Sequence, residues 1–198
     1  MGTMEPDLTL IERDRSCLVV IDVQQHFLDK LPPDWRIPLV ERIAWLMRAA
    51  RALDIPVVGT AEDMERLGPL VPELAGCLPP DAPPVFDKTV FGAWGQSDIR
   101  AALEESGRDS FVLAGLETDV CVAQSALGLR AGGYRVAVVA DACGSPPPNH
   151  EYGLRRLGNT GIVLTTVKGV FYEWAQDVET ASRVRAELGG PGPPGVIL

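Results

Sequence analysis

The chain has 198 residues, of which 46% are hydrophobic and 23% are charged, the proportions of one ordinary globular domain that can bury a core without disulfides. Its formal net charge of −9 and pI of about 4.7 oppose binding to a nucleic-acid backbone or an anionic membrane. The N-terminal residues show no apolar signal segment, and no apolar run reaches the roughly 18 residues of a membrane span. We therefore expect a cytoplasmic protein with reduced cysteines and no nucleic-acid or membrane partner.

Short apolar runs rich in β-branched residues alternate with helical patterns along the chain. The runs predict strands over residues 17–22, 55–60, 84–88, 109–115, 134–141 and 162–167. Helical spacing predicts helices over residues 38–54, 97–107, 119–133 and 149–161, and again after residue 167 up to Leu188. Ser97 fits a helix N-cap and Gly107 a helix stop, whereas the Pro- and Gly-rich segment 61–84 is typical of a loop.

Strands that alternate with helices indicate βαβ units and a mainly parallel sheet. The strands are almost continuously apolar, as expected where helices cover both faces of the sheet. We therefore predict an α/β fold with three α-β-α layers and six strands, in a single domain that spans residues 1–198. The segment 189–198 is rich in Gly and Pro, and we expect a flexible or partner-bound tail there.

Polar residues follow three of the predicted strands. Asp22 ends the first, Lys88 ends the third, and Cys121 lies just after the fourth at the start of a helix. Ligands bind at the carboxyl ends of the strands in open α/β sheets, so the three side chains could converge on one crevice. A helix N-terminus lowers the pKa of a thiol, so this position predicts a reactive, thiolate-rich Cys121.

Plainer interpretations of the same residues stay open. Asp22 and Lys88 could be charges at exposed strand ends, and Cys121 could be a small residue that packs a helix on the sheet. For Asp141, which ends the fifth predicted strand, capping of the following loop is the interpretation we favour. The sequence has two histidines and no C-x-x-C pair, which leaves a structural zinc site without support.

Three segments together resemble the isochorismatase-like cysteine hydrolases. They are "VVIDVQQHF", "DKTVFGAW" and "LAGLETDVCVAQSALGLRAGGYRVAVVADACGS", in the order and spacing of that superfamily. The resemblance runs from about Cys17 to about Trp174, and the segment around Cys121 is its most specific part. It implies an isochorismatase-like, Rossmann-like fold.

The resemblance implies a catalytic triad of Asp22, Lys88 and Cys121. Cys121 would attack an amide carbonyl to form a thioester, Asp22 would carry the proton, and Lys88 would keep Asp22 ionised. The resemblance also implies a cis peptide bond between Leu116 and Glu117. The backbone N–H groups of Glu117 and Cys121 would then form the oxyanion hole.

The sequence also departs from parts of that superfamily. The Asp-x-His metal motif of nicotinamidases is absent from "GTAEDMERLG", so we predict no metal and no cofactor. The isochorismate-cleaving branch does not use the thiol, so the presence of Cys121 favours metal-independent hydrolysis of an amide-type C–N bond in a small molecule. Phe27, Phe91 and Trp94 flank the triad segments and are candidates for the substrate pocket, with core packing as the alternative.

The resemblance and the apolar C-terminal residues 196–198 predict a homo-oligomer, a dimer or tetramer. A catalytically silent binding or regulatory protein on the same fold is the alternative function. A phosphatase built on the first Asp would require D-x-D, which "DVQ" lacks, and papain-like chemistry lacks a suitably placed histidine.

Overall fold

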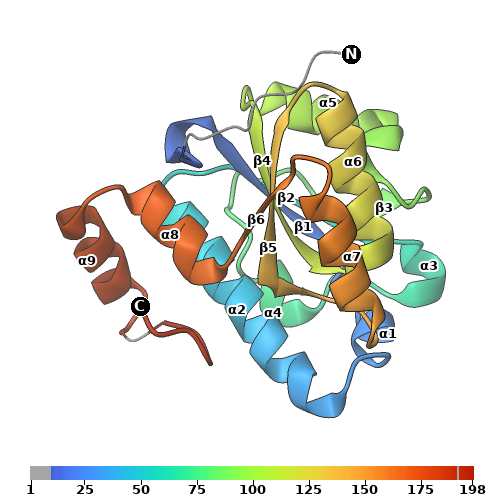
Figure 1. The fold of residues 1–198 in the computed structure, drawn as a ribbon, viewed down its shortest axis with the longest axis horizontal. Coiled ribbons are helices and arrows are strands. Elements are labelled where there is room, and N and C mark those ends of the chain that lie inside the picture. The colour runs from blue at the N-terminus through green and yellow to red at the C-terminus, as the bar shows by residue number, and fades with distance from the viewer. Residues whose placement is uncertain (1–9, 191) are drawn as a thin grey trace.

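The computed structural model describes residues 10–190 and 192–198, and its centre is a six-stranded sheet (Figure 1). The strand order is β3-β2-β1-β4-β5-β6, and every neighbouring pair is parallel. The strands are β1 (Ser16–Ile21), β2 (Val57–Glu62), β3 (Phe86–Lys88), β4 (Ser110–Leu116), β5 (Arg135–Gly144) and β6 (Val163–Thr165).

Helices cover both faces of the sheet (Figure 1). On one face lie α2 (Pro33–Ala52), α8 (Val167–Ala175) and α9 (Val178–Glu187); on the other lie α5 (Ser97–Glu105), α6 (Ala123–Ala131) and α7 (Asn149–Gly158). Short turns complete the chain: η1 (Arg13–Arg15), α1 (Gln25–Leu28), α3 (Met64–Leu67), α4 (Pro72–Ala75), η2 (Ala93–Gly95) and η3 (Thr118–Val122). The predicted three-layer α/β architecture is therefore confirmed.

The central strands are buried because each face of the sheet packs on its own hydrophobic cluster. Every residue of β1 and β4 is buried, and alternate residues point to opposite faces. In β1, Leu18 and Val20 join the cluster beneath α2, whereas Val19 and Ile21 join the cluster beneath α5 and α6. This double burial explains the uninterrupted apolar runs in the sequence.

The strand order places a topological switch point between β1 and β4. From β1 the chain moves outward to β2 and β3, and it then returns to β4 and continues outward to β5 and β6 on the other side. A crevice forms at such a point because the adjacent connections leave the sheet in opposite directions. The residues that follow β1 and β4 therefore lie at the expected ligand-binding edge.

Several boundaries differ from the sequence prediction for local reasons. Helix α2 begins at Pro33, because proline is compatible with a first helical turn, and it continues through Pro38. Ser97 is the first residue of α5 and does not cap it, since Gln96 holds the cap position. Strand β5 continues past Asp141, whose carboxylate accepts the backbone N–H of Val167 at the start of α8 instead of capping the next loop.

The C-terminal segment lies against the first hydrophobic cluster. Val196 and Leu198 pack on that cluster, whereas the side chain of Ile197 is 86% exposed. Among the helices in the described part of the chain, none is both long and apolar enough to cross a membrane. Whether the whole chain is one domain with a flexible or partner-bound tail stays a prediction.

Candidate active site

Asp22 follows β1 directly and lies in a strained backbone conformation. Its φ of 50° is in the left-handed region, which non-glycine residues rarely adopt. Its backbone N–H donates to the Thr60 carbonyl, and the Thr60 hydroxyl donates to Oδ1 at 2.8 Å. The side chain is fully buried. These bonds from β2 hold the carboxylate at the carboxyl edge of the sheet.

Lys88 ends β3, and its fully buried ammonium group meets acceptors from several elements. Nζ lies 2.9 Å from Asp22 Oδ2, 3.4 Å from Glu62 Oε2 and 3.7 Å from Cys121 Sγ. It also donates to the Val90 carbonyl at 2.7 Å. The edge strand β3 thus places the Lys88 ammonium beside Asp22, which follows β1, and Cys121, which follows β4. Lys88 is therefore buried, and the alternative of an exposed charge at a strand end is wrong.

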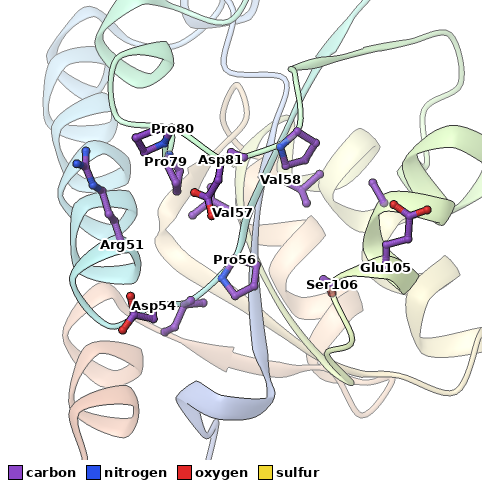
Figure 2. A pocket seen from close by; sticks show the side chains of 14 residues that line it. Arg51, Asp54, Pro56, Val57, Val58, Pro79, Pro80, Asp81, Glu105 and Ser106 are labelled. Carbon is purple, nitrogen blue, oxygen red and sulfur yellow. The ribbon is translucent and has the colours of Figure 1, made fainter.

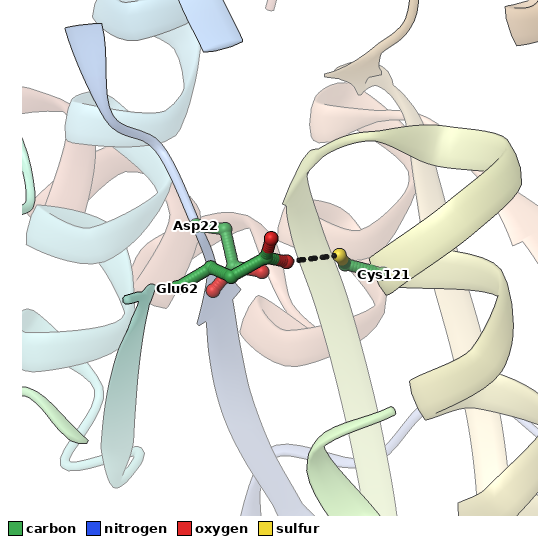
Figure 3. Close-up of side chains that lie close together, drawn as sticks. All are labelled: Asp22, Glu62 and Cys121. Carbon is green, nitrogen blue, oxygen red and sulfur yellow. Dashed lines mark hydrogen bonds between the residues drawn. The ribbon is translucent and has the colours of Figure 1, made fainter. Parts of the chain in front are cut away.

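Cys121 lies in the π-helical turn η3, just before α6, and is 2% exposed. Its thiol donates to Glu62 Oε2 at 3.1 Å, and Figure 3 shows the two side chains pointing toward each other, with Asp22 next to Glu62. The preceding Leu116–Glu117 peptide bond is cis, at the position that the resemblance implied. The structure therefore brings Asp22, Lys88 and Cys121 together at the switch point.

Glu62 is a fourth member of this cluster that the sequence analysis missed. It ends β2 and pairs in register with Lys88. Its backbone N–H donates to Gln24 Oε1 at 2.7 Å, and Gln24 Nε2 donates to its carbonyl at 2.8 Å. The signal in the sequence was an acidic residue at the end of the second strand, the same reasoning that selected Asp22 and Lys88.

Burial dominates the electrostatics of the cluster. It raises the pKa of Asp22 above its usual value, although Lys88 and Thr60 act in the opposite direction. Burial alone would lower the pKa of Lys88, but the Asp22 carboxylate and the Cys121 sulfur raise it, so the ammonium stays charged.

The pKa of Cys121 corrects our expectation of a thiolate-rich residue. Burial and the Asp22 carboxylate raise the pKa of this thiol, and the hydrogen bond to Glu62 raises it further, although Lys88 acts in the opposite direction. The expectation rested on the helix N-terminus and left out the burial of the sulfur and the two neighbouring carboxylates. The thiol is therefore neutral in this geometry. Among the other cysteines, burial raises the pKa of Cys17 to about 12, as expected for an inert thiol.

The comparisons with known proteins agree with this geometry. The family model described as the isochorismatase domain matches residues 16–168, which include all four residues of the cluster. The isochorismatase domain-containing protein 2 of Xenopus laevis is 33% identical over 172 residues, which cover 83% of this chain and 78% of that protein.

The chain belongs to the isochorismatase family. Two solved structures share its fold at 27% identity. YcaC from Pseudomonas aeruginosa, solved with hexane-2,5-diol and covalent acrylamide, has a TM-score of 0.80 and covers 90% of this chain and 91% of its own. YcaC from Escherichia coli is described as an octameric hydrolase of unknown specificity. It has a TM-score of 0.82, and the match covers 93% of this chain and 91% of the E. coli chain.

This member of the isochorismatase family has a poor donor set for a metal. The donor atoms of Asp22, Glu62 and Cys121 lie within 4.8 Å of one another. However, the ammonium of Lys88 lies among them, at 2.9 Å from Asp22 and 3.4 Å from Glu62. A divalent cation bound there would meet this positive charge at close range. The residues therefore do not fit a metal, and no step of the proposed reaction uses one.

The three candidate pocket residues lie in different surroundings. Phe27 is 5% exposed within the first hydrophobic cluster, with Lys30 Nζ 4.4 Å from its ring centre. The ring of Trp94 is partly buried, packs against Tyr134 and lies on the second hydrophobic cluster, so its place in the pocket stays a prediction. Phe91 is 54% exposed and remains a candidate pocket residue.

A surface pocket of about 650 Å³ lies away from the cluster (Figure 2). Its lining includes Pro56, Val57 and Val58 from the start of β2, together with the proline-rich loop at residues 79–83. The start of β2 is at the amino end of the sheet, whereas Asp22 and Glu62 lie at the carboxyl end. This pocket is therefore not the active-site crevice.

Two side-chain contacts brace the turn that carries Cys121, and the sequence analysis assigned no role to either. Thr118 Oγ1 lies 2.8 Å from His150 Nδ1, and the Ser145 hydroxyl donates to Asp119 Oδ1 at 2.7 Å. Gly153 of α7 packs so closely on this turn that a Cβ there would lie 3.0 Å from the Asp119 backbone. Residues after β5 and in α7 therefore position the turn before the thiol.

Proposed function

We propose that the protein is a metal-independent hydrolase that cleaves the C–N bond of a small amide, with Cys121 as nucleophile. One observation carries this proposal: a thiol, a carboxylate and an ammonium from three separate strand ends meet at the switch point. Such convergence of titratable groups is the usual mark of an active site. The E. coli relative is described as a hydrolase, which supports the reaction class.

The first half of the reaction forms a thioester. Asp22 takes the proton of the Cys121 thiol, and the sulfur attacks the amide carbonyl carbon. The backbone N–H groups of Glu117 and Cys121 stabilise the resulting oxyanion. The intermediate collapses when Asp22 returns the proton to the leaving nitrogen and the C–N bond breaks.

Water completes the reaction by hydrolysis of the thioester. Asp22 takes a proton from the attacking water and passes it to the departing sulfur, which restores the neutral thiol. Burial raises the pKa of Asp22, which makes its carboxylate a stronger base toward the thiol and the water than an exposed carboxylate would be. Lys88 holds Asp22 in place and balances its charge throughout.

The P. aeruginosa relative is described with covalent acrylamide, a small electrophile that bonds to nucleophiles through its vinyl carbon and keeps its amide bond. This is consistent with a nucleophilic side chain in a relative of this chain, the role that we propose here for Cys121. We further propose that the substrate is a small molecule and that the protein works in the cytosol, where its four free cysteines would stay reduced.

The proposal is tested by the release of ammonia or amine from a panel of small amides. Cys121→Ala should abolish turnover and leave the melting temperature unchanged. Cys121→Ser should be nearly inactive, because an alkoxide is much harder to generate than a thiolate. Cys77→Ala is the matched control and should retain full activity. A Cys121→Ala variant that keeps turnover, or a wild-type protein inactive on the whole panel, would overturn the proposal.

A double variant tests whether the residues act as one unit. Asp22→Asn should be as severe as Cys121→Ala, since an amide side chain cannot accept the thiol proton. When residues act as one unit, the loss of one slows the reaction about as much as the loss of all. The double variant should therefore be no slower than either single variant. A much slower double variant would mean that Asp22 and Cys121 work independently.

A further inference from the structure

The carboxylate of Glu62 contacts the Cys121 sulfur, which is the atom that attacks the substrate in the proposed reaction. Its Oε2 accepts the Cys121 thiol at 3.1 Å and lies 3.4 Å from Lys88 Nζ (Figure 3). Its side chain is 17% exposed, whereas those of Asp22 and Lys88 are fully buried. Glu62 is thus the member of the cluster that solvent reaches most readily, and it contacts the nearly buried thiol directly.

This position obstructs the reaction in the free enzyme. A carbonyl carbon has to come within about 3–3.5 Å of the sulfur before attack. The Glu62 carboxylate already lies at that range. The hydrogen bond from the thiol also stabilises the protonated sulfur. Attack therefore requires the Glu62 side chain to move.

The backbone of Glu62 is fixed, so side-chain rotation is the available movement. Gln24 is fully buried and holds both the N–H and the carbonyl of Glu62. Within the described residues, the polar contacts found for the Glu62 carboxylate are those with Cys121 and Lys88. Since Lys88 is also paired with Asp22, another cation at the mouth of the site would draw Glu62 away from the thiol.

The charge of the cluster favours such a cation. With the thiol neutral, the carboxylates of Asp22 and Glu62 face the one ammonium of Lys88, which leaves an excess of one negative charge. The whole chain also carries a net charge of −9. A cationic group on the substrate would compensate this excess, whereas an anionic group would meet the exposed edge of Glu62.

We propose that Glu62 determines substrate specificity: its carboxylate covers the Cys121 thiol in the free enzyme and moves onto a cationic group of the substrate. The site then selects small amides that carry an ammonium or amidinium group near the scissile carbonyl. Once Glu62 has moved, the thiol proton passes to Asp22 and attack follows as described above. This inference rests on the proposed amide hydrolysis and narrows its substrate class.

Thiol-specific reagents that differ only in charge test the inference without a known substrate. Methanethiosulfonates with an aminoethyl, methyl or sulfonatoethyl group are cationic, neutral and anionic, and each transfers its thioalkyl group to a thiolate. The rate at Cys121 is read by peptide mass spectrometry at neutral pH. Wild-type protein should react faster with the cationic reagent than with the anionic one.

Two substitutions separate the two roles of Glu62. Glu62→Gln should lower the cationic-to-anionic rate ratio at least about tenfold. It should also speed the neutral reagent about tenfold, because a neutral amide near the sulfur disfavours the thiolate less than a carboxylate does. Glu62→Asp keeps the charge but shortens the side chain, so it should speed the neutral reagent and preserve the rate ratio. The matched control is Glu65→Gln, which removes an exposed charge from neighbouring α3 and should change neither quantity.

The outcomes distinguish this inference from the proposed function. If Glu62→Gln leaves both the rate ratio and the neutral rate unchanged, the role of Glu62 is overturned even where Cys121→Ala abolishes turnover. If Cys121→Ala retains turnover, the proposed function fails whatever the reagents show. Turnover of glycinamide, which is cationic, against neutral propionamide provides the final check. Wild-type protein should favour glycinamide, and Glu62→Gln should remove that preference.

Discussion

Lys88 is a fully buried cation whose charge is balanced by two carboxylates. Ionised groups are costly to bury, and removal of one partner leaves the other charge without compensation. Removal of Lys88 would affect Asp22 most strongly, because the Asp22 side chain is fully buried and burial already raises its pKa. Lys88 therefore contributes to the stability of the site as well as to the proposed chemistry.

Lys88→Met should destabilise the protein by about 3–5 kcal/mol at neutral pH, the usual cost of breaking a buried pair. The pKa of Asp22 should rise further in this variant, so the folded state binds the proton more tightly than the unfolded state does. Stability should then fall as pH rises from about 4, the usual Asp pKa, through the raised folded value. Urea unfolding at acidic and neutral pH measures this difference.

Lys30→Met is the matched control for Lys88→Met. The side chain of Lys30 is 39% exposed, and its Nζ lies 3.5 Å from Glu117. Lys30 is partly exposed and can keep its contact with Phe27 through a methionine side chain, so this variant should show no dependence of its stability change on pH. If Lys88→Met were equally stable at acidic and neutral pH, its loss of stability would not come from a buried, unpaired carboxylate at Asp22, and the prediction would be wrong.

At the scale of single residues, the sequence revealed the cluster only in part. Asp22, Lys88 and Cys121 could be predicted because each lies at or shortly after the carboxyl end of a predicted strand. Glu62 ends β2 in the structure, but it lies two residues beyond the strand predicted over residues 55–60. The φ of 50° at Asp22 and the neutral state of the thiol depend on contacts between strands far apart in sequence, so no local pattern reports them.

At the scale of elements, the join between β1 and β4 depends on one glycine. Gly115 has a φ of 128°, and a Cβ there would overlap the carbonyl oxygen of Ile21 and lie 2.8 Å from its nitrogen. Ile21 precedes Asp22, and Gly115 comes two residues before Glu117. The two strands can therefore bring the site together only if position 115 carries no side chain.

Gly115→Ala should cost at least about 3 kcal/mol and displace the site, because the methyl group overlaps backbone that cannot rotate away. The comparison is Gly107→Ala. Gly107 also has a positive φ, of 65°, but nothing lies within 4 Å of its Cβ position. That variant should cost about 1 kcal/mol from backbone strain alone. Equal melting temperatures for the two variants would refute the steric argument.

The existence of an element was predictable where burial produces a regular pattern of apolar residues. The ends of an element were less predictable where they depend on tertiary contacts. Strands β1 and β4 follow from apolar runs that are buried along their whole length, whereas the short edge strands β3 and β6 are partly exposed. The first turn of α2 was missed because it begins with Pro33 and contains few apolar residues. The π-helical turn that begins at Thr118 was expected as ordinary helix, and its shape depends on contacts with Ser145 and His150.

At the scale of the whole molecule, self-association stays a prediction, which the isochorismatase resemblance and the apolar residues 196–198 suggested. The C-terminal segment offers a defined surface. Val196 and Leu198 pack on the first hydrophobic cluster and fix the path of the chain, which leaves the side chain of Ile197 between them 86% exposed. We propose that a second copy of the chain covers this side chain.

We therefore predict a mass in solution that is a multiple of the 21.3 kDa chain, measured by size-exclusion chromatography with light scattering. Ile197→Asp should shift the mass toward that of a smaller assembly, because an interface cannot bury an unpaired carboxylate without a large cost. Val178→Asp is the control, since Val178 is 83% exposed at the start of α9 and should tolerate the charge. If Val178→Asp dissociates the protein and Ile197→Asp does not, the contact lies on α9 and not on the C-terminal segment. A single-chain mass for the wild type would refute self-association.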